Sequence, residues 1–330
     1  MKKNPDRWLC YVSICIVTVA LMCGCNCDSV QTDETVKRED ITIPLSETMK
    51  LEMIWVEPGT FTMRRSDSVY YQVTLTKGYW LGKYEVTQAQ YQTVMGWNPA
   101  EVPVEDYGRG ENCPIFWVAW EDATNFCAML TEIERAAGRL PEGYEYNLPT
   151  EAQWEYACRA GTTTDLNSGK NLTDENEHSE TNEEDWDGDI VSHRGEITIH
   201  YNSSHSGRSK YSEMDEVGWY GGNSRGKAHP VGQKKPNAWG FYDMHGNVWE
   251  WCLDWWDPYQ AFRGEAVKNP KGPLASKNFN YYGEENICVR RGGSWYTDAH
   301  GCVSGSMDRY CPHDIWWSEC GFRVALVSVK

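Results

Sequence analysis

The chain has few positively charged residues, which bears on the class of partner that it can bind. It has only 31 Lys and Arg against 48 Asp and Glu, which gives a formal net charge of −17 at pH 7. Proteins bind nucleic acids largely through cationic side chains that displace counterions from phosphates. The composition therefore argues against a nucleic-acid-binding protein and favours metal cations as partners.

Phenylalanine is scarce among the aromatic residues, with 7 Phe beside 17 Trp and 19 Tyr. Most of the aromatic surface therefore carries an indole N–H or a phenol O–H, which needs a hydrogen-bond partner when it is buried. We expect a core that is held by side-chain hydrogen bonds as well as by packing. At 330 residues the chain fits one large irregular domain, and the sequence shows no second core.

The N-terminus has the pattern of an export signal. Lys2, Lys3 and Arg7 precede an apolar run from Trp8 to Met22, which ends in small residues and cysteines. The run is close to the lower length limit for a membrane span, and a polar stretch follows it. We therefore expect cleavage, with a retained signal anchor as the alternative.

The end of this run resembles a bacterial lipobox, in which Cys25 is the lipidated residue and Cys23 or Cys27 are alternatives. Residues 1–25 are then a lipoprotein-type signal peptide, and the polar residues 26–48 are a flexible tether. The folded body is expected over residues 49–330. Such a protein would be anchored by lipid in the bacterial cell envelope, where it faces the periplasm or the exterior.

Capping signals and periodicity predict three helices in an otherwise turn-rich chain. Thr87-x-x-Gln90 and the Thr150 segment are capping boxes, each followed by a short helix. A longer helix is expected over about Trp120–Ala136, with Phe126, Leu130 and Ile133 on one face. Val73–Leu75 alternates as a strand. The sequence thus predicts an α+β protein with unusually little regular structure.

The segment from about residue 165 to residue 216 is acidic and poor in apolar residues, as in NLTDENEHSETNEEDWDGD. We interpret it as a solvated surface insertion. Its carboxylates could alternatively gather a cation, but their spacing repeats no known metal-binding loop.

One segment combines features that neither a plain helix nor a plain strand requires. Pro236–Trp256 reads PNAWGFYDMHGNVWEWCLDWW, with two Asn-containing turns and several tryptophans around one acid, Glu250. It resembles the core of the formylglycine-generating-enzyme family, also called the sulfatase-modifying-factor family. Further matches follow in the family's order: MIWVEPGTFTM (Met53–Met63), LGKYEVTQAQYQTVM (Leu81–Met95), LPTEAQWEYACRAGT (Leu148–Thr162), and RGGSW through GFRVAL (Arg291–Leu326).

This resemblance covers about residues 50–328 and implies the family's irregular α+β fold, which is C-type-lectin-like. Enzymes of the family oxidise a cysteine in a Cys-x-Pro-x-Arg sulfatase peptide to formylglycine. Whether this chain shares that activity depends on the residues at the positions that match the oxidase site.

The turn from Asp243 to Glu250 offers two carboxylates, an Asn and several carbonyls, and calcium takes such mixed oxygen ligands at about 2.3–2.6 Å. The resemblance implies a calcium site formed by the side chains of Asp243 and Glu250 and the carbonyls of Gly246 and Val248. A second family site maps onto Asn223 and the carbonyl of Arg225. The alternative role for both carboxylates is hydrogen bonding to turn amides and indoles.

Oxidases of the family hold copper between two cysteines that are separated by four residues, just after the RGGS motif. The matching residues here are Thr297 and Cys302, so the first thiolate is missing. A hydroxyl does not replace a soft thiolate as a copper(I) ligand. Gly301 also departs from the pattern, because the oxidases carry an aromatic residue there. Copper is therefore expected only if another cysteine completes the site.

If the chain were an oxidase, the resemblance would assign catalysis to Cys302, with Ser294 and Trp249 lining the substrate groove. No base partner for Ser294 is evident in the sequence, which argues against a serine nucleophile. A structural role in the Gly-Gly-Ser turn is the favoured interpretation of Ser294.

Eight cysteines follow the signal region, and an even number in an exported protein favours one or two disulfides. Spacing does not fix the pairing, although a Cys302–Cys311 loop is one option. The resemblance places Cys158 at a family disulfide position, but its partner position is Val324 here. Cys127 and Cys158 lie on predicted helices, where we expect buried free thiols.

Three functions of different classes remain: an active formylglycine-generating oxidase, a binding module, and an exported enzyme or accessory factor with other chemistry. The missing thiolate and the abundant tryptophan favour binding or accessory function. The partner would be a protein or peptide, such as a sulfatase, or a glycan. The third class usually adds an iron-binding domain with a His cluster, and the sequence shows none.

Overall fold

The computed structural model describes residues 39–66, 69–101, 106–173, 188–193, 196–201, 210–256, 266–272, 287–310 and 319–329. The expected signal peptide with Cys25, the tether up to residue 38, and Cys311 lie outside these ranges. Arg38–Lys330 forms one compact unit. No helix within the described ranges is long and apolar enough to cross a membrane.

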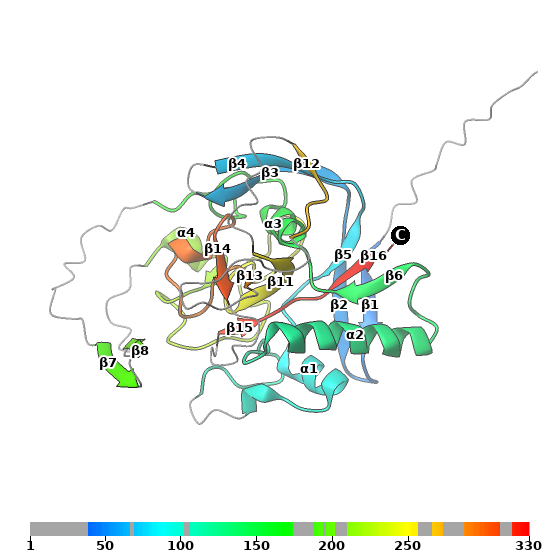
Figure 1. The fold of residues 1–330 in the computed structure, drawn as a ribbon, viewed down its shortest axis with the longest axis horizontal. Helices are drawn as coiled ribbons and strands as arrows, with labels where there is room; N and C mark the ends of the chain where they lie inside the picture. The colour runs from blue at the N-terminus through cyan, green and yellow to red at the C-terminus, as the bar shows by residue number, and fades with distance from the viewer. Residues whose placement is uncertain are drawn as a thin grey trace, which may run out of the picture. The chain divides into compact units, whose positions relative to one another are not determined.

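A five-stranded sheet joins the two ends of this unit, with strand order β1-β2-β5-β16-β6 (Figure 1). Its strands are β1 (Ile41–Pro44), β2 (Lys50–Val56), β5 (Tyr79–Gly82), β6 (Tyr144–Asn147) and β16 (Ala325–Ser328). The C-terminal strand β16 pairs antiparallel with both β5 and β6. This pairing brings the GFRVAL motif back beside the first third of the chain.

The folded body begins earlier than residue 49, where the sequence placed its start. β1 pairs with β2 in the register Ile41↔Met53, and the side chain of Ile43 is buried in the core. The alternation of Ile41 and Ile43 with polar residues explains this strand, because it buries one face against the sheet. Four residues of the expected tether therefore form an edge strand.

A second sheet carries the most family-like segments, in the order β14-β13-β11-β15, and all four strands are labelled in Figure 1. Its strands are β11 (Trp249–Trp255), β13 (Cys288–Arg291), β14 (Met307–Tyr310) and β15 (Cys320–Gly321). The helix α3 (Glu151–Arg159) packs against β11 and β13. The motifs around Glu250, Arg291 and Gly321 thus become neighbours, with Glu250 opposite both of the others.

A third sheet combines a hairpin with a strand from a distant part of the chain. β3 (Gly59–Ser66) and β4 (Val69–Leu75) pair antiparallel, and β12 (Val267–Lys268) adds to β4 in parallel. The expected strand Val73–Leu75 is confirmed as the end of β4. β12 and the residues after it form a strap, Val267–Gly272, along this sheet.

The three predicted helices are confirmed, with their capping boxes where they were expected. Thr87 caps α1 (Gln88–Met95), Thr150 caps α3, and α2 spans Trp120–Ala136. Ile133 was placed on the buried face of α2 but is 37% exposed. Glu134 takes the buried position instead, because its carboxylate is paired with Arg139. Two 3-10 helices cover Pro99–Glu101 and His300–Cys302.

The acidic insertion is not wholly irregular. It contains a two-stranded hairpin, β7 (Gly188–His193) with β8 (Glu196–Tyr201), and the short helix α4 (Ser212–Asp215). The parallel pair β9 (Gly218–Trp219) and β10 (His245–Gly246) follows it. The two ends of the insertion also contribute apolar side chains to the core, Leu166 from one end and Met214 from the other. The two ends of the insertion are therefore buried rather than solvated.

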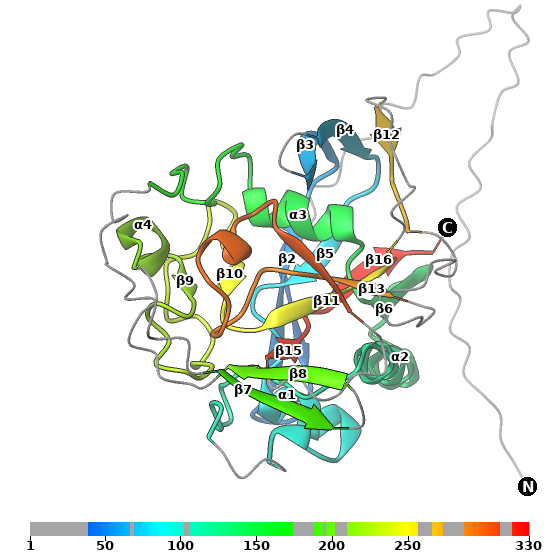
Figure 2. The same ribbon diagram turned by 60° about the vertical axis from the view of Figure 1, so that its left-hand side comes forward.

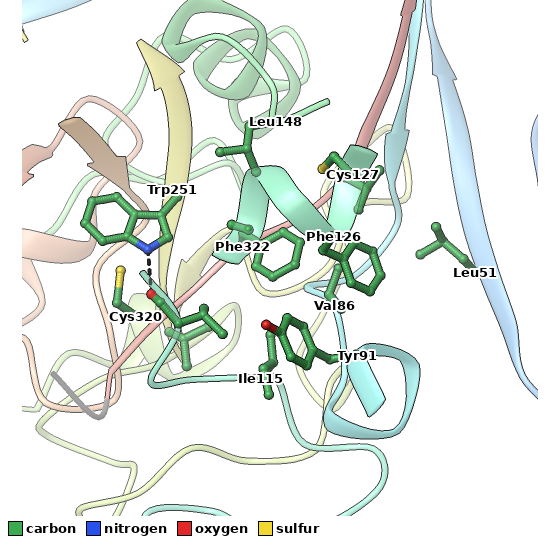
Figure 3. Packing of buried hydrophobic residues seen from close by; sticks show 14 of the residues in the cluster. Leu51, Val86, Tyr91, Ile115, Phe126, Cys127, Leu148, Trp251, Cys320 and Phe322 are labelled. Carbon is green, nitrogen blue, oxygen red and sulfur yellow. Dashed lines mark hydrogen bonds between the residues drawn. The ribbon is translucent and has the colours of Figure 1, made fainter. Parts of the chain in front are cut away.

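The main core lies between the five-stranded sheet, α1, α2 and the start of β11, and Figure 3 shows part of it. The indole of Trp251 is buried there and donates to the carbonyl of Val118 at 2.9 Å. Trp120 likewise donates to the carbonyl of Cys252 at 2.8 Å, and the hydroxyl of Tyr79 to that of Gln153 at 2.6 Å. The expectation of a hydrogen-bonded aromatic core is confirmed for these three side chains, whereas the hydroxyl of Tyr91 and the indole N–H of Trp295 are buried without a partner among the described residues.

Candidate functional site

Four charged side chains lie together beneath the turn that the sequence singled out. Glu85, Asp243, Glu250 and Arg323 are each at most 2% exposed and interact electrostatically. Charged side chains are almost never fully buried unless they are paired. The four make a cluster of three carboxylates and one guanidinium, which we call the carboxylate cluster.

Arg323 and Glu250 form the central pair of this cluster. Arg323 Nε and Nη2 donate to Glu250 Oε2 and Oε1, each at 2.6 Å, in the two-pronged geometry that suits a guanidinium. The indole Nε1 of Trp154 donates to the same Oε2 at 2.7 Å. Arg323 also donates to the carbonyls of Gly82 and Tyr242, both at 3.0 Å. One side chain thus joins β5, β11 and the turn before β10.

Two further carboxylates add negative charge. Glu85 accepts from the Asn247 side chain at 2.7 Å and from the Val248 N–H at 3.1 Å. Asp243 Oδ2 accepts from the Gly232 N–H at 2.6 Å, while its Oδ1 is buried and has no hydrogen-bond partner among the described residues. Burial, followed by repulsion from the two neighbouring carboxylates, raises the pKa of Glu85 well above its usual range. Burial likewise raises the pKa of Asp243 to about 6.

The predicted calcium ligands fit a cation only in part. Asp243 keeps one unsatisfied buried oxygen, and the carbonyls of Gly246 and Val248 belong to the same turn. The excess of negative charge also favours a cation. Both oxygens of Glu250 already accept from Arg323, and Oε2 also accepts from Trp154, so Glu250 is the least available of the predicted side-chain ligands. No group of three or more His, Cys, Asp or Glu side chains in the described part of the chain is arranged to hold a metal ion.

The second predicted calcium site rests on a side chain that already has other partners. Asn223 Oδ1 accepts from the Tyr220 N–H at 2.9 Å, and its Nδ2 donates to Asp215 and to the carbonyl of Gly218. Asn223 thereby closes a turn. Arg225, two residues later, has a positive φ of 56°. The hydrogen bonds of Asn223 and the turn at Arg225 do not require a metal ion. The second calcium site stays a prediction.

At the positions matching the copper site, Thr297 belongs to a hydrogen-bonded network. Its Oγ1 lies 2.8 Å from Ser294 Oγ and accepts from the Ser294 N–H at 3.1 Å. Ser294 Oγ in turn donates to Glu319 Oε2 at 2.6 Å. No base partner for Ser294 was evident in the sequence, and the structure places the Glu319 carboxylate against its hydroxyl. Glu319 lies 25 residues away and carries no local signal, but its carbonyl also accepts from the Trp249 N–H.

The absence of a side chain at Gly301 leaves room for the side chain of Thr297. A Cβ atom at residue 301 would lie 2.3 Å from the Thr297 methyl group, well inside van der Waals contact. The two departures from the oxidase pattern are thus sterically coupled. A larger residue at position 301 would require Thr297 to move out of its network with Ser294.

Cys302 is fully buried by the ends of the insertion. It lies in a small apolar cluster with Leu166, Met214, Val217, Tyr220, Ala299 and Val303. Its Sγ lies 3.9 Å from the carbonyl oxygen of Ser294. Cys302 thus packs against apolar side chains from both ends of the insertion, Leu166 and Met214. The residues present do not fit a copper ion held by two exposed thiolates.

Trp249 is also less accessible than a groove-lining residue would be. It is 4% exposed, and the guanidinium of Arg290 lies 4.9 Å from the centre of its ring. Arg290 is itself paired with Asp308 at 2.7 Å. Trp249, Ser294 and Cys302 thus lie inside the molecule, where they pack and donate or accept hydrogen bonds.

For five of the eight cysteines the expectation of disulfides is not borne out. Cys113, Cys127, Cys158, Cys252 and Cys320 are buried free thiols. Burial raises the pKa of Cys158 and of Cys320 to about 12, so both are protonated at neutral pH. The buried thiols predicted for Cys127 and Cys158 are confirmed. The proposed Cys302–Cys311 loop includes a residue outside the described ranges.

The sequence can be compared with known families and proteins. It matches the family described as "Sulfatase-modifying factor enzyme 1-like domain" over residues 42–327. It is 30% identical to the formylglycine-generating enzyme of Mus musculus, over 69% of this chain and 48% of that protein. It is also 30% identical to the chaperone protein LppX of Paenibacillus barcinonensis, over 63% of this chain and 73% of that protein. The chain spans about half the length of the mouse enzyme.

Two solved structures share the fold over nearly their whole length. Treponema denticola variable protein 1 has a TM-score of 0.62 and 24% identity, and the match covers 87% of this chain and 98% of that chain. PvdO from Pseudomonas aeruginosa has a TM-score of 0.56 and 22% identity, with 88% and 99% covered. At these identities the likeness shows the fold alone.

Proposed function

We propose that this chain, which belongs to the sulfatase-modifying factor enzyme 1-like family, acts as a binding or accessory protein of the bacterial cell envelope and lacks copper-dependent cysteine oxidase activity. The observation that carries the proposal is the network of Thr297, Ser294 and Glu319. Thr297 stands where the first thiolate would be, and its hydroxyl is already hydrogen-bonded to Ser294. A single buried thiol, Cys302, does not provide two soft ligands for copper(I).

An accessory role on this scaffold is in keeping with one relative. The protein from Paenibacillus barcinonensis that shares 30% identity is named a chaperone, whereas the mouse relative is named an enzyme. We propose that the partner is a protein or peptide, for which a sulfatase is one candidate, with a glycan as the alternative ligand class. An active formylglycine-generating oxidase is the alternative, and a peptide oxidation assay distinguishes the two.

The test of the proposal is oxidation of a Cys-x-Pro-x-Arg peptide with copper and oxygen present. We expect the wild-type chain to form no aldehyde, because one thiolate neither completes the copper site nor exchanges with a neighbouring thiol. Mass spectrometry of the peptide would measure this. Copper-dependent aldehyde formation that disappears in Cys302→Ser would establish the oxidase alternative instead.

We further propose that calcium binds at the Asp243 turn and stabilises the domain. Support comes from the unsatisfied Oδ1 of Asp243 and from the excess of carboxylates over guanidinium in the carboxylate cluster. Asp243 and the carbonyls of Gly246 and Val248 would hold the ion. Its charge would offset the buried negative charge.

A ligand that binds only the native state adds about 2.7 kcal/mol at a hundredfold excess over its Kd. A calcium chelator should therefore lower the melting temperature of the wild type and hardly change that of Asp243→Ala. Asp106→Ala is the matched control, because Asp106 is an exposed acid paired with Lys227, and its chelator shift should equal that of the wild type. Equal shifts in all three proteins, or no shift in the wild type, would count against the site.

The lipid anchor at Cys25 is likewise a proposal, supported by the basic start, the apolar run and the Gly24-Cys25 junction. Mass spectrometry of the membrane-extracted protein should find a diacylglyceryl-modified peptide that begins at Cys25. A mature protein that retains Met1 would refute the anchor.

A further inference from the structure

The strap is held at its two ends by different kinds of contact. At its beginning β12 pairs with β4, and the Asn269 N–H donates to the Thr74 carbonyl at 2.9 Å; Figure 2 shows β12 beside β4. At its end the Gly272 N–H donates to Asp254 Oδ1 of β11 at 2.6 Å. Asp254 Oδ2 accepts from the Glu151 N–H, at the start of α3, at 2.7 Å. The contact at the end of the strap therefore depends on a titratable group.

The end of the strap lies directly against the backbone of β11. A Cβ atom at Gly272 would lie 2.7 Å from the Trp255 carbonyl oxygen and 2.8 Å from Asp254 Cβ. With the strap in this position Asp254 is only 7% exposed, whereas Lys268 and Lys271, the charged residues of the strap, are exposed. Separation of Gly272 from β11 would therefore admit water to the Asp254 carboxyl group.

The buried charges carried by α3, β11 and β13 do not balance. Arg291 of β13 is paired with Glu151 at 2.9 Å and with Glu155 at 2.6 Å. Arg159 of α3 is paired with Glu155 as well, at 2.8 Å. Asp254 is a third acid beside these two cations, and its two oxygens accept from backbone amides. In the described ranges, no guanidinium or ammonium group is paired with it.

This environment disfavours the ionised form of Asp254. Burial, followed by repulsion from Glu151, raises the pKa of Asp254 to about 7, although the two amide donors and the charge of Arg291 oppose the change. The other titratable group of β11 here is Cys252, and burial raises the pKa of its thiol well above the usual range. Asp254 is therefore the group at this contact that changes its charge near neutral pH.

The direction of the pH effect follows from which state holds the proton more tightly. While Gly272 lies on β11, the pKa of Asp254 is about 7. When Gly272 separates and water reaches the carboxyl group, the cost of burial disappears and the pKa falls toward its ordinary value. Protonation therefore favours the closed strap, and this contribution to closure is lost as the pH rises through about 7.

We propose that Asp254 makes the end of the strap a pH-sensitive closure, which lies on β11 when this carboxyl group is protonated and separates more readily when it is ionised. Ionisation releases the proton to water. Asn269 and Pro270 of the strap line a cavity of about 460 Å³, so the same step displaces part of one wall of that cavity. The proposal goes beyond the proposed accessory function and does not depend on it.

The test is hydrogen exchange of the Gly272 amide in the full chain, measured by mass spectrometry with residue-level fragmentation at pH 6 and pH 8, on either side of about 7. Each rate is divided by that of an unstructured peptide of the same sequence at the same pH, because exchange itself accelerates with pH. We expect the normalised rate to rise about tenfold, since opening releases one proton below pH 7 and none well above it. The Asn269 amide, bonded to Thr74, is the internal control and should not change.

Two substitutions separate the proton from the shape of the side chain. Asp254→Asn carries no charge at either pH, so its Gly272 amide should exchange at the same normalised rate at both. Glu151→Gln removes the repulsion that helps to raise the pKa of Asp254, so the rise should occur at lower pH and be smaller than tenfold between pH 6 and pH 8.

A constant normalised rate in the wild type, or an equal rise at Asn269, would overturn the proposal. So would a tenfold rise that persists in Asp254→Asn. If Asp254→Asn does not fold, Glu151→Gln decides, because a rise of unchanged size and midpoint in that variant would also overturn the proposal.

Discussion

Glu250→Gln should lower the free energy of unfolding by about 3–5 kcal/mol, measured by denaturant unfolding monitored through tryptophan fluorescence. This is the cost of removing one partner of a buried ion pair, because the other charge then remains buried without compensation. Arg323 would keep its two carbonyl acceptors but lose both of its bonds to an anionic carboxylate. The change removes one charge and preserves the shape of the side chain, so packing contributes little.

Glu132→Gln provides the matched control for this substitution. Glu132 is also paired with an arginine, Arg135, but both side chains are more than half exposed. Exposed pairs of this kind contribute only about 0–1 kcal/mol. Equal effects of the two substitutions would mean that the pair of Glu250 and Arg323 does not hold the core together.

Gly246→Ala should destabilise the chain at least as strongly, by more than about 3 kcal/mol, and should prevent accumulation of folded protein if the domain is less stable than that. Gly246 has a φ of +79°, and a Cβ atom there would lie 1.9 Å from the carbonyl oxygen of Trp219. That oxygen belongs to the backbone of the paired strand β9, so it does not move aside as a flexible side chain does.

Gly138→Ala separates the steric contact from the backbone conformation. Gly138 follows α2 with a φ of +69°, but a Cβ atom at that position meets nothing within 4 Å. The control therefore carries only the left-handed conformation, which costs about 1–2 kcal/mol. Circular-dichroism melting curves of the two variants would measure the difference. If both lost the same stability, the close approach of β9 to β10 would not be the cause.

Much of the fold could be predicted from the sequence, because local signals and family motifs agreed. The capping residues Thr87 and Thr150 depend only on neighbours within three residues, and both begin helices where they were expected. The position of Ile133 was wrong for a reason outside the helix. Periodicity does not reveal that Glu134 is buried with a partner, Arg139, that lies beyond the end of the helix.

The candidate site was less predictable, since its partners lie far apart in the chain. Glu250 was identified as the acid among the tryptophans, but its partner Arg323 is 73 residues away and Trp154 is 96 residues away. Both stand inside motifs that the sequence analysis quoted, yet nothing in those motifs assigns them to Glu250. Glu319, the partner of Ser294, lies between the RGGSW and GFRVAL motifs and belongs to neither.

The burial of Leu166 and Met214 in one apolar cluster has a consequence for how this protein can vary. Since Leu166 and Met214 are anchored in the same cluster, the chain between them closes a loop, and closing a longer loop costs more entropy. That entropy changes slowly, by about 0.6 kcal/mol for each doubling of length. Added length between these two anchors therefore costs little closure entropy, which makes this segment a position where new recognition elements could be inserted.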